Sequence, residues 1–246
     1  MMRSGNPALT ADTFSLDRPV AREDAMTIQG TVNKAALTLL ITMVTAMFVW
    51  SRFFAGLPIT AFMIGGAIGG FIVSLITIFK KTAAPITTPL YGGLEGLFLG
   101  GLSATFEAQY PGIVINAVTL TFGTLLALLM AYKSRLIRVT ENFRLGLAAA
   151  TGGIFLIYMI NMVMGFFGTQ MPFIHEAGLM GIGFSLFVVG IAAFNLVLDF
   201  DFIEQGAEQG APKYLEWYGA FGLIVTLVWL YIEVLRLLVK LQSRRD

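Results

Sequence analysis

The chain has 246 residues and one net positive charge at neutral pH, with 57% hydrophobic residues, 13% charged residues and a mean hydropathy of +0.79. A soluble domain carries about 25% charged residues, so this composition predicts an integral membrane protein, and the near-zero net charge argues against nucleic acid as a partner. The lack of cysteine excludes disulfides and thiolate metal sites, and a single histidine leaves no room for a multi-histidine metal site.

Residues 1–34 form a polar and charged segment ahead of the first apolar run. The segment has no apolar stretch of the kind found in a signal peptide, so we expect the first membrane span itself to direct insertion. Its composition predicts a flexible cytoplasmic tail, and an amphipathic helix on the membrane surface around 20–34 is the alternative.

Apolar segments near the roughly 20 residues needed to cross a bilayer follow this tail. Seven spans are expected, at about 35–54, 58–79, 86–106, 113–132, 146–168, 179–201 and 217–240. Such long continuous runs argue against a membrane β-barrel. They predict one all-α polytopic membrane helix bundle over 35–240, followed by a basic tail at 241–246.

The distribution of lysine and arginine predicts the orientation of the chain. Most basic residues near the ends of spans fall on the side of the N-terminus, and the loops at 107–112 and 169–178 have none. The N-terminus is therefore expected in the cytoplasm. Seven spans would then place the basic C-terminal tail outside, so six spans with a re-entrant last segment remain an alternative.

Small residues predict close helix packing in the second and third spans. Gly65/Gly69 and Gly66/Gly70 form two overlapping GxxxG pairs, and the pattern continues with glycines in the third span. Tight packing within the chain is the expected role, with a homodimer face as the alternative. The protein is accordingly expected to be a monomer or a weak homo-oligomer.

Two carboxylates end the sixth apolar run. From Ala177 to Leu198 there are 22 residues without a charge, and Asp199 and Asp201 follow. Carboxylates at that depth cost roughly 2.5–3.5 kcal/mol each, so a functional role is the default interpretation. Two residues apart on a helix, they point in nearly opposite directions. We expect Asp199 to face the bundle interior and Asp201 to face the inner interface.

Glu233, in the seventh span, has two candidate partners. Arg236 lies three residues on and could form a local ion pair. Alternatively, Glu233 approaches Asp199 across the bundle, where two close carboxylates could share a proton and bind a hard cation such as calcium. Lys80 or Lys81, at the inner end of the second span, could supply a counter-ion.

Two further acidic positions have weaker signals. Glu95 lies in the middle of the third span among glycines, where a buried hydrogen bond and the lining of a cation path are equal alternatives. His175 and Glu176 lie in a short polar turn, where a solvated pair is more typical than a metal site.

Several long strings of the chain resemble the Bax inhibitor-1/YccA-like family of small membrane proteins, in particular its bacterial Bax-inhibitor-like branch. They are ITTPLYGGLEGLFLG at 86–100, YPGIVINAVTLTFG at 110–123, SRLIRVTENFR at 134–144, PFIHEAGLMGIGFSL at 172–186 and LDFDFIEQGAEQGAPKYLEWY at 198–218. The resemblance implies a seven-helix fold in the bacterial inner membrane and a pH-sensitive calcium leak activity.

The resemblance also implies roles for particular residues. In the family, two aspartates, in the sixth and seventh helices, share a hydrogen bond and gate a pore, and a basic residue latches the first. Asp199 matches the first acid, Glu233 the second, and Lys80 or Lys81 the latch. Here the second acid is glutamate, and a lysine latch lacks the bidentate geometry of arginine.

The sequence thus favours a pH-gated cation pathway with calcium as the expected ion and no resident cofactor. A non-conducting regulator that binds other membrane proteins, in stress or protease control, is the alternative. An intramembrane enzyme is not expected, because the acids have no usable histidine, cysteine or metal cluster beside them.

Overall fold

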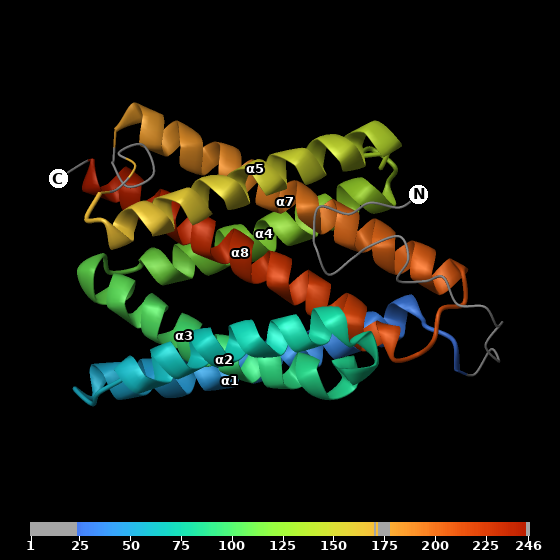
Figure 1. Cartoon of the computed structure of the whole chain (residues 1–246), viewed down its shortest axis with the longest axis horizontal. Coiled ribbons are helices and arrows are strands. Elements are labelled where there is room, and N and C mark those ends of the chain that lie inside the picture. The colour runs from blue at the N-terminus through green and yellow to red at the C-terminus, as the bar shows by residue number, and fades with distance from the viewer. Residues whose placement is uncertain (1–23, 170, 172–177, 245–246) are drawn as a thin grey trace. The chain divides into compact units, whose positions relative to one another are not determined.

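The computed structural model describes residues 24–169, 171 and 178–244. Within these residues it contains seven α-helices, one short 3-10 helix and no strand. The elements are α1 (Ile28–Phe54), α2 (Thr60–Phe79), η3 (Lys81–Ala83), α3 (Ala84–Gln109), α4 (Ile113–Lys133), α5 (Glu141–Phe166), α7 (Leu179–Glu208) and α8 (Leu215–Ser243) (Figure 1). The predicted all-α fold is confirmed.

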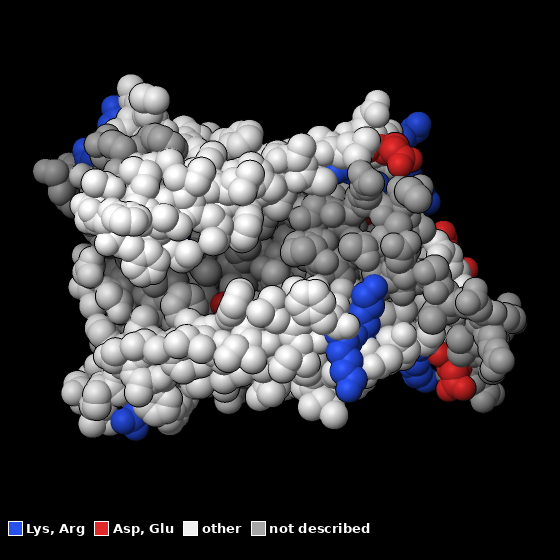
Figure 2. Space-filling view, in the orientation of Figure 1, with Lys and Arg blue, Asp and Glu red and all other residues white. Residues whose placement is uncertain are grey.

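The described residues divide into two compact units. The α4–α5 unit comprises residues 112–200 and 226–244, and the α1–α3 unit comprises residues 24–111 and 201–225. Helices α7 and α8 each contribute one part to either unit, so each unit is described below by itself. On the face shown in Figure 2, side chains along the middle of the helices are almost all uncharged, as lipid-facing surfaces require.

Six of the described helices are long and apolar enough to cross a membrane: α1, α2, α4, α5, α7 and α8. Helix α3 is not among them, because its glycines, threonines and prolines, with Glu95 and Glu107, lower its hydropathy. The last predicted segment, 217–240, lies within α8, which is one uninterrupted helix of 29 residues. The predicted spans are therefore all helical, and α3 alone falls short by hydropathy.

Three helix ends lie five or more residues from the predicted span limits. Helix α1 begins at Ile28 rather than near 35, because the Thr27 hydroxyl accepts a hydrogen bond from Gly30 N at 2.9 Å and caps the first turn. Thr140 caps α5 in the same way. Helix α7 continues past Asp201 to Glu208, and its end is followed by Gly210 at a φ of +66°. Polar helical turns extend beyond the apolar runs that hydropathy detects.

Helix α3 packs closely on α1 through its own glycines and on α2 through glycines of both helices. A Cβ at Gly96 would overlap the Thr45 hydroxyl and the Thr42 carbonyl oxygen of α1, and a Cβ at Gly100 would lie 2.7 Å from Ala46 Cα. On the α2 side, a Cβ at Gly66 would lie 2.5 Å from the Leu94 carbonyl oxygen. These contacts confirm the tight packing expected within the chain.

The α4–α5 unit is joined by aromatic and amide contacts between helices. Phe143 and Phe194 lie edge to face with ring centroids 5.8 Å apart, and Tyr158 and Phe184 do so at 6.2 Å. These pairs show that α5 and α7 run antiparallel. The buried Asn195 of α7 donates to Thr151 Oγ1 of α5 at 2.9 Å. Such a polar contact fixes the register of two apolar helices.

Candidate functional site

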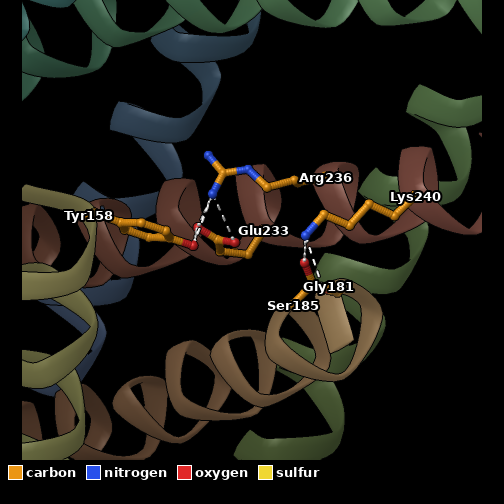
Figure 3. A network of polar contacts seen from close by, with 6 residues as sticks. All are labelled: Tyr158, Gly181, Ser185, Glu233, Arg236 and Lys240. Atoms are coloured by element: carbon orange, nitrogen blue, oxygen red, sulfur yellow. Dashed lines mark hydrogen bonds and ion pairs between the residues drawn. The ribbon is translucent and has the colours of Figure 1, made fainter. Parts of the chain in front are cut away.

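Helix α8 carries three charged residues one turn apart in an otherwise apolar stretch. Glu233, Arg236 and Lys240 are spaced by three and four residues, so they share one face of the helix. Glu233 and Lys240 are only 2% and 4% exposed. All three belong to the α4–α5 unit, and Figure 3 shows them from close by.

Glu233 is held by a hydroxyl and a guanidinium. Tyr158 of α5 donates its hydroxyl hydrogen to Glu233 Oε1 at 2.9 Å, and Arg236 Nη1 lies 3.2 Å from the same oxygen. Arg236 Nη1 also donates to the Tyr158 hydroxyl oxygen at 2.9 Å, and its Cζ lies 5.2 Å from the centre of that ring. Of the two partners that the sequence left open for Glu233, the local ion pair with Arg236 is present.

Lys240 ties the end of α8 to the beginning of α7. Its Nζ donates to the Gly181 carbonyl oxygen at 3.0 Å and to Ser185 Oγ at 2.8 Å (Figure 3). Ser185 is itself buried. A buried ammonium needs hydrogen-bond partners in place of water, and these two oxygens provide them.

The two aspartates of α7 differ in burial. Asp199 is completely buried, whereas Asp201 is half-buried and accepts a hydrogen bond from Gln205 Nε2 at 2.7 Å. Their spacing predicts this difference. Asp199 and Glu233 belong to the same unit, and a proton or a cation shared between them stays a prediction.

The remaining predicted site residues lie in the α1–α3 unit. Lys80 is exposed, and Lys81 Nζ lies 5.8 Å from the centre of the Tyr218 ring. Glu95 is half-buried on α3, where the absence of a side chain at Gly70 makes room for its carboxylate. The latch and the ion path assigned to these residues stay predictions. His175 and Glu176 lie outside the described residues.

Sequence reasoning missed an ion pair that joins the beginnings of α1 and α8. Glu216 Oε1 accepts hydrogen bonds from Thr27 N and Thr27 Oγ1, each at 2.9 Å, and Lys34 pairs with Glu216 Oε2. The carboxylate thereby compensates the partial positive charge at the α1 N-terminus. Gly30 is required beside it, because a Cβ there would overlap the Glu216 carboxylate. The capping signal at Thr27 is visible in the sequence, but its distant partner is not.

Tyr158, Ser185 and Lys240 were also missed as site residues. Hydroxyls on apolar helices carry no distinctive spacing, and their partners are far away in the chain. Across the described part of the chain, no group of three or more His, Asp or Glu side chains is arranged to hold a metal ion. The two-carboxylate calcium site at Asp199 and Glu233 stays a prediction.

A model of one protein family, described as Bax inhibitor 1 like, matches residues 6–243. No curated protein and no solved structure gives a significant match. The matched region includes every described helix up to the last residue of α8, together with Asp199 and Glu233. The resemblance drawn from the sequence is therefore confirmed, and the chain belongs to the Bax inhibitor 1 like family.

Proposed function

We propose that this protein conducts a cation across the membrane in a pH-sensitive way, with calcium as the expected ion and Asp199 and Glu233 as the gate. The observation that carries the proposal is the buried carboxylate of Glu233, held by Tyr158 and Arg236 inside an apolar helix. A buried acid within a membrane span marks an ion or proton pathway by default.

Protonation gives this arrangement two states. While Glu233 is ionised, Arg236 and the Tyr158 hydroxyl both bind its Oε1. Once Glu233 is protonated, the guanidinium loses its counter-charge. Arg236, whose side chain is 38% exposed, is then free to turn away from the carboxyl group. The protonation state of one residue thereby changes the face that α8 presents.

Calcium is the expected ion because of the chemistry of the two acids. Calcium prefers carboxylate and carbonyl oxygens as ligands. Asp199 and Glu233 would supply such oxygens, and Arg236 would act as a tethered cation that competes for Glu233 in the closed state. Asp201 at the end of the path, Lys80 or Lys81 as the latch and Glu95 as a lining residue complete the proposal.

The proposed topology has seven spans, with α3 counted as one of them, in the bacterial inner membrane with the N-terminus in the cytoplasm. Helix α3 has 26 residues, enough to cross at 1.5 Å per residue despite its modest hydropathy. Support for the last crossing comes from Lys240, which contacts Gly181 and so lies at the end of the unit opposite to the α4–α5 loop.

The test is calcium flux into proteoliposomes containing the full chain, measured over a pH series. We expect a flux whose pH dependence is lost in Asp199→Asn and in Glu233→Gln. The matched control is Glu208→Gln, which removes an exposed carboxylate from α7 and should leave both flux and pH dependence intact. An unchanged pH profile in both acid variants would show that these residues are not the gate.

A silent flux assay would favour the other function that the sequence allows, a regulator that binds other membrane proteins. That outcome would be accompanied by one membrane protein that co-purifies with the full chain in stoichiometric amount. Deletion of residues 1–23 distinguishes conduction from regulation, because a conducting bundle should retain its calcium flux without these residues.

A further inference from the structure

The α4–α5 loop concentrates positive charge at one end of the α4–α5 unit. Between the last residue of α4 and the first turns of α5, the chain carries Lys133, Arg135, Arg138 and Arg144 against a single acid, Glu141. Basic and acidic side chains gather where α4 joins α5, at the upper right of Figure 2. Only seven residues, 134–140, separate two helices that can each span a bilayer. A connection this short cannot leave the bilayer surface by more than about 12 Å.

The backbone of the loop is held in an uncommon conformation. Arg135 has a φ of +60°, and among the described residues it is the one non-glycine residue with a positive φ. The other four positions of this kind are Gly56, Gly112, Gly168 and Gly210. A side chain at such a position strains the backbone, and strain that is retained points to a function. An arginine thus stands where glycine would fit better.

Backbone hydrogen bonds fix the direction of the next residue. Leu136 N and Ile137 N both donate to the Ala131 carbonyl oxygen, at 3.0 and 3.2 Å, and close the end of α4. Leu136 is left 81% exposed at the tip of the loop. Its neighbours Arg135 and Arg138 are exposed as well. A large apolar side chain between two cations matches the boundary between headgroups and acyl chains, where the apolar group enters the lipid.

We propose that this loop binds anionic phospholipid, with Arg135 and Arg138 on the headgroup phosphates and Leu136 inserted among the acyl chains. Arginine suits phosphate because its planar guanidinium offers paired donors. A cluster of basic residues beside the end of a span attracts an anionic leaflet. The site is distinct from the proposed gate, because it lies outside the helices that hold Glu233 and Asp199.

The first experiment measures lipid selectivity. The full chain in detergent is offered equal amounts of phosphatidylglycerol and phosphatidylcholine, and the retained lipid is identified by native mass spectrometry. We expect preferential retention of phosphatidylglycerol, and a fall in that preference of about fivefold for each arginine neutralised in Arg135→Gln and Arg138→Gln. Arg244→Gln with Arg245→Gln removes the same charge from the C-terminal tail and should leave the preference unchanged.

The Arg135→Gly variant separates lipid binding from folding. Glycine accepts a positive φ without strain, so this variant should fold at least as stably as the wild type while losing preference for phosphatidylglycerol. No preference in the wild type, or an equal loss in the tail variant, would overturn the proposal. Equal loss would mean that net charge alone attracts the lipid.

The second experiment tests insertion of Leu136. Because the chain has no cysteine, Leu136→Cys can be labelled with an environment-sensitive fluorophore in vesicles of phosphatidylcholine with or without phosphatidylglycerol. We expect a blue shift on adding phosphatidylglycerol, reversed by high salt. Leu57→Cys is the matched control, since Leu57 is 47% exposed in the α1–α2 turn but lacks a basic cluster. The same shift at both sites, or none at position 136, would contradict insertion.

Discussion

The buried Glu233 carboxylate of α8 is stabilised by two neighbours that donate hydrogen bonds to it. Tyr158 and Arg236 both contact Oε1, and they also contact each other, so each pair of the three is directly bonded. In a closed triangle of this kind, the loss of one member weakens the other two contacts. The Arg236 side chain remains 38% exposed, so solvent screens part of the attraction.

This arrangement predicts a coupled effect of substitutions on stability. Arg236→Gln leaves the Glu233 carboxylate buried with one partner, and should lower the free energy of unfolding by about 2 kcal/mol after allowance for solvent screening. Glu233→Gln together with Arg236→Gln should cost less than Arg236→Gln alone, since no buried charge is then left without its counter-charge. Denaturant titration in detergent micelles measures the free energy of unfolding of the single and the double variant.

Two further variants complete this stability test. Tyr158→Phe removes one hydroxyl hydrogen bond without altering charge and should cost about 1 kcal/mol. Arg244→Gln removes an exposed arginine of the same helix region and should have almost no effect. If the double variant loses as much stability as Glu233→Gln and Arg236→Gln measured singly and added together, Glu233 and Arg236 are not coupled.

At the scale of helices, the sequence predicted where helices form better than where they end. Hydropathy registers which residues lie in lipid, so it located the seven α-helices of the described residues but missed their polar turns at 28–34 and 202–208. It also could not separate α3, whose glycines serve close packing, from helices that face lipid. The spacing of Glu233 and Arg236 is visible in the sequence. The Tyr158 and Glu216 contacts depend on tertiary structure and are not.

The close packing of α3 leads to a prediction that compares neighbouring glycines. Gly96→Ala should lower the stability of the protein by about 1–3 kcal/mol, because the new methyl group would overlap the Thr42 backbone and force α1 away from α3. Gly93→Ala, on the same helix, places its Cβ 3.6 Å from Ile41 Cγ2, an ordinary contact. It should be neutral or slightly stabilising, because alanine favours helix over glycine.

Thermal unfolding of both variants in the same detergent measures this difference. The comparison cancels the general effect of replacing glycine by alanine in a helix, so the remaining difference reports the α1–α3 contact. Equal midpoints for the two variants would mean that the α1–α3 packing tolerates a methyl group and that the close approach of these helices is not needed for stability.

For the whole molecule, α3 decides whether the chain crosses the membrane six or seven times. If α3 crosses, residues at its two ends face opposite sides of the membrane, and the chain has seven spans with its termini on opposite sides. Thr82 lies just before α3 and Gln109 is its last residue, and both are exposed. Ser134 and Ser243 mark the α4–α5 loop and the end of α8.

Single-cysteine labelling shows on which side of the membrane each of these positions lies, and the chain has no cysteine that would have to be removed first. In intact spheroplasts, a membrane-impermeant maleimide should react with Gln109→Cys and Ser243→Cys, and with Thr82→Cys and Ser134→Cys only after permeabilisation. This expectation follows from the proposed orientation, in which the basic residues beside positions 82 and 134 hold those ends on the cytoplasmic side. Reaction of positions 82 and 109 from the same side would mean that α3 does not cross. With six crossings instead of seven, the α4–α5 loop or the N-terminus would then have to lie outside, against the distribution of basic residues.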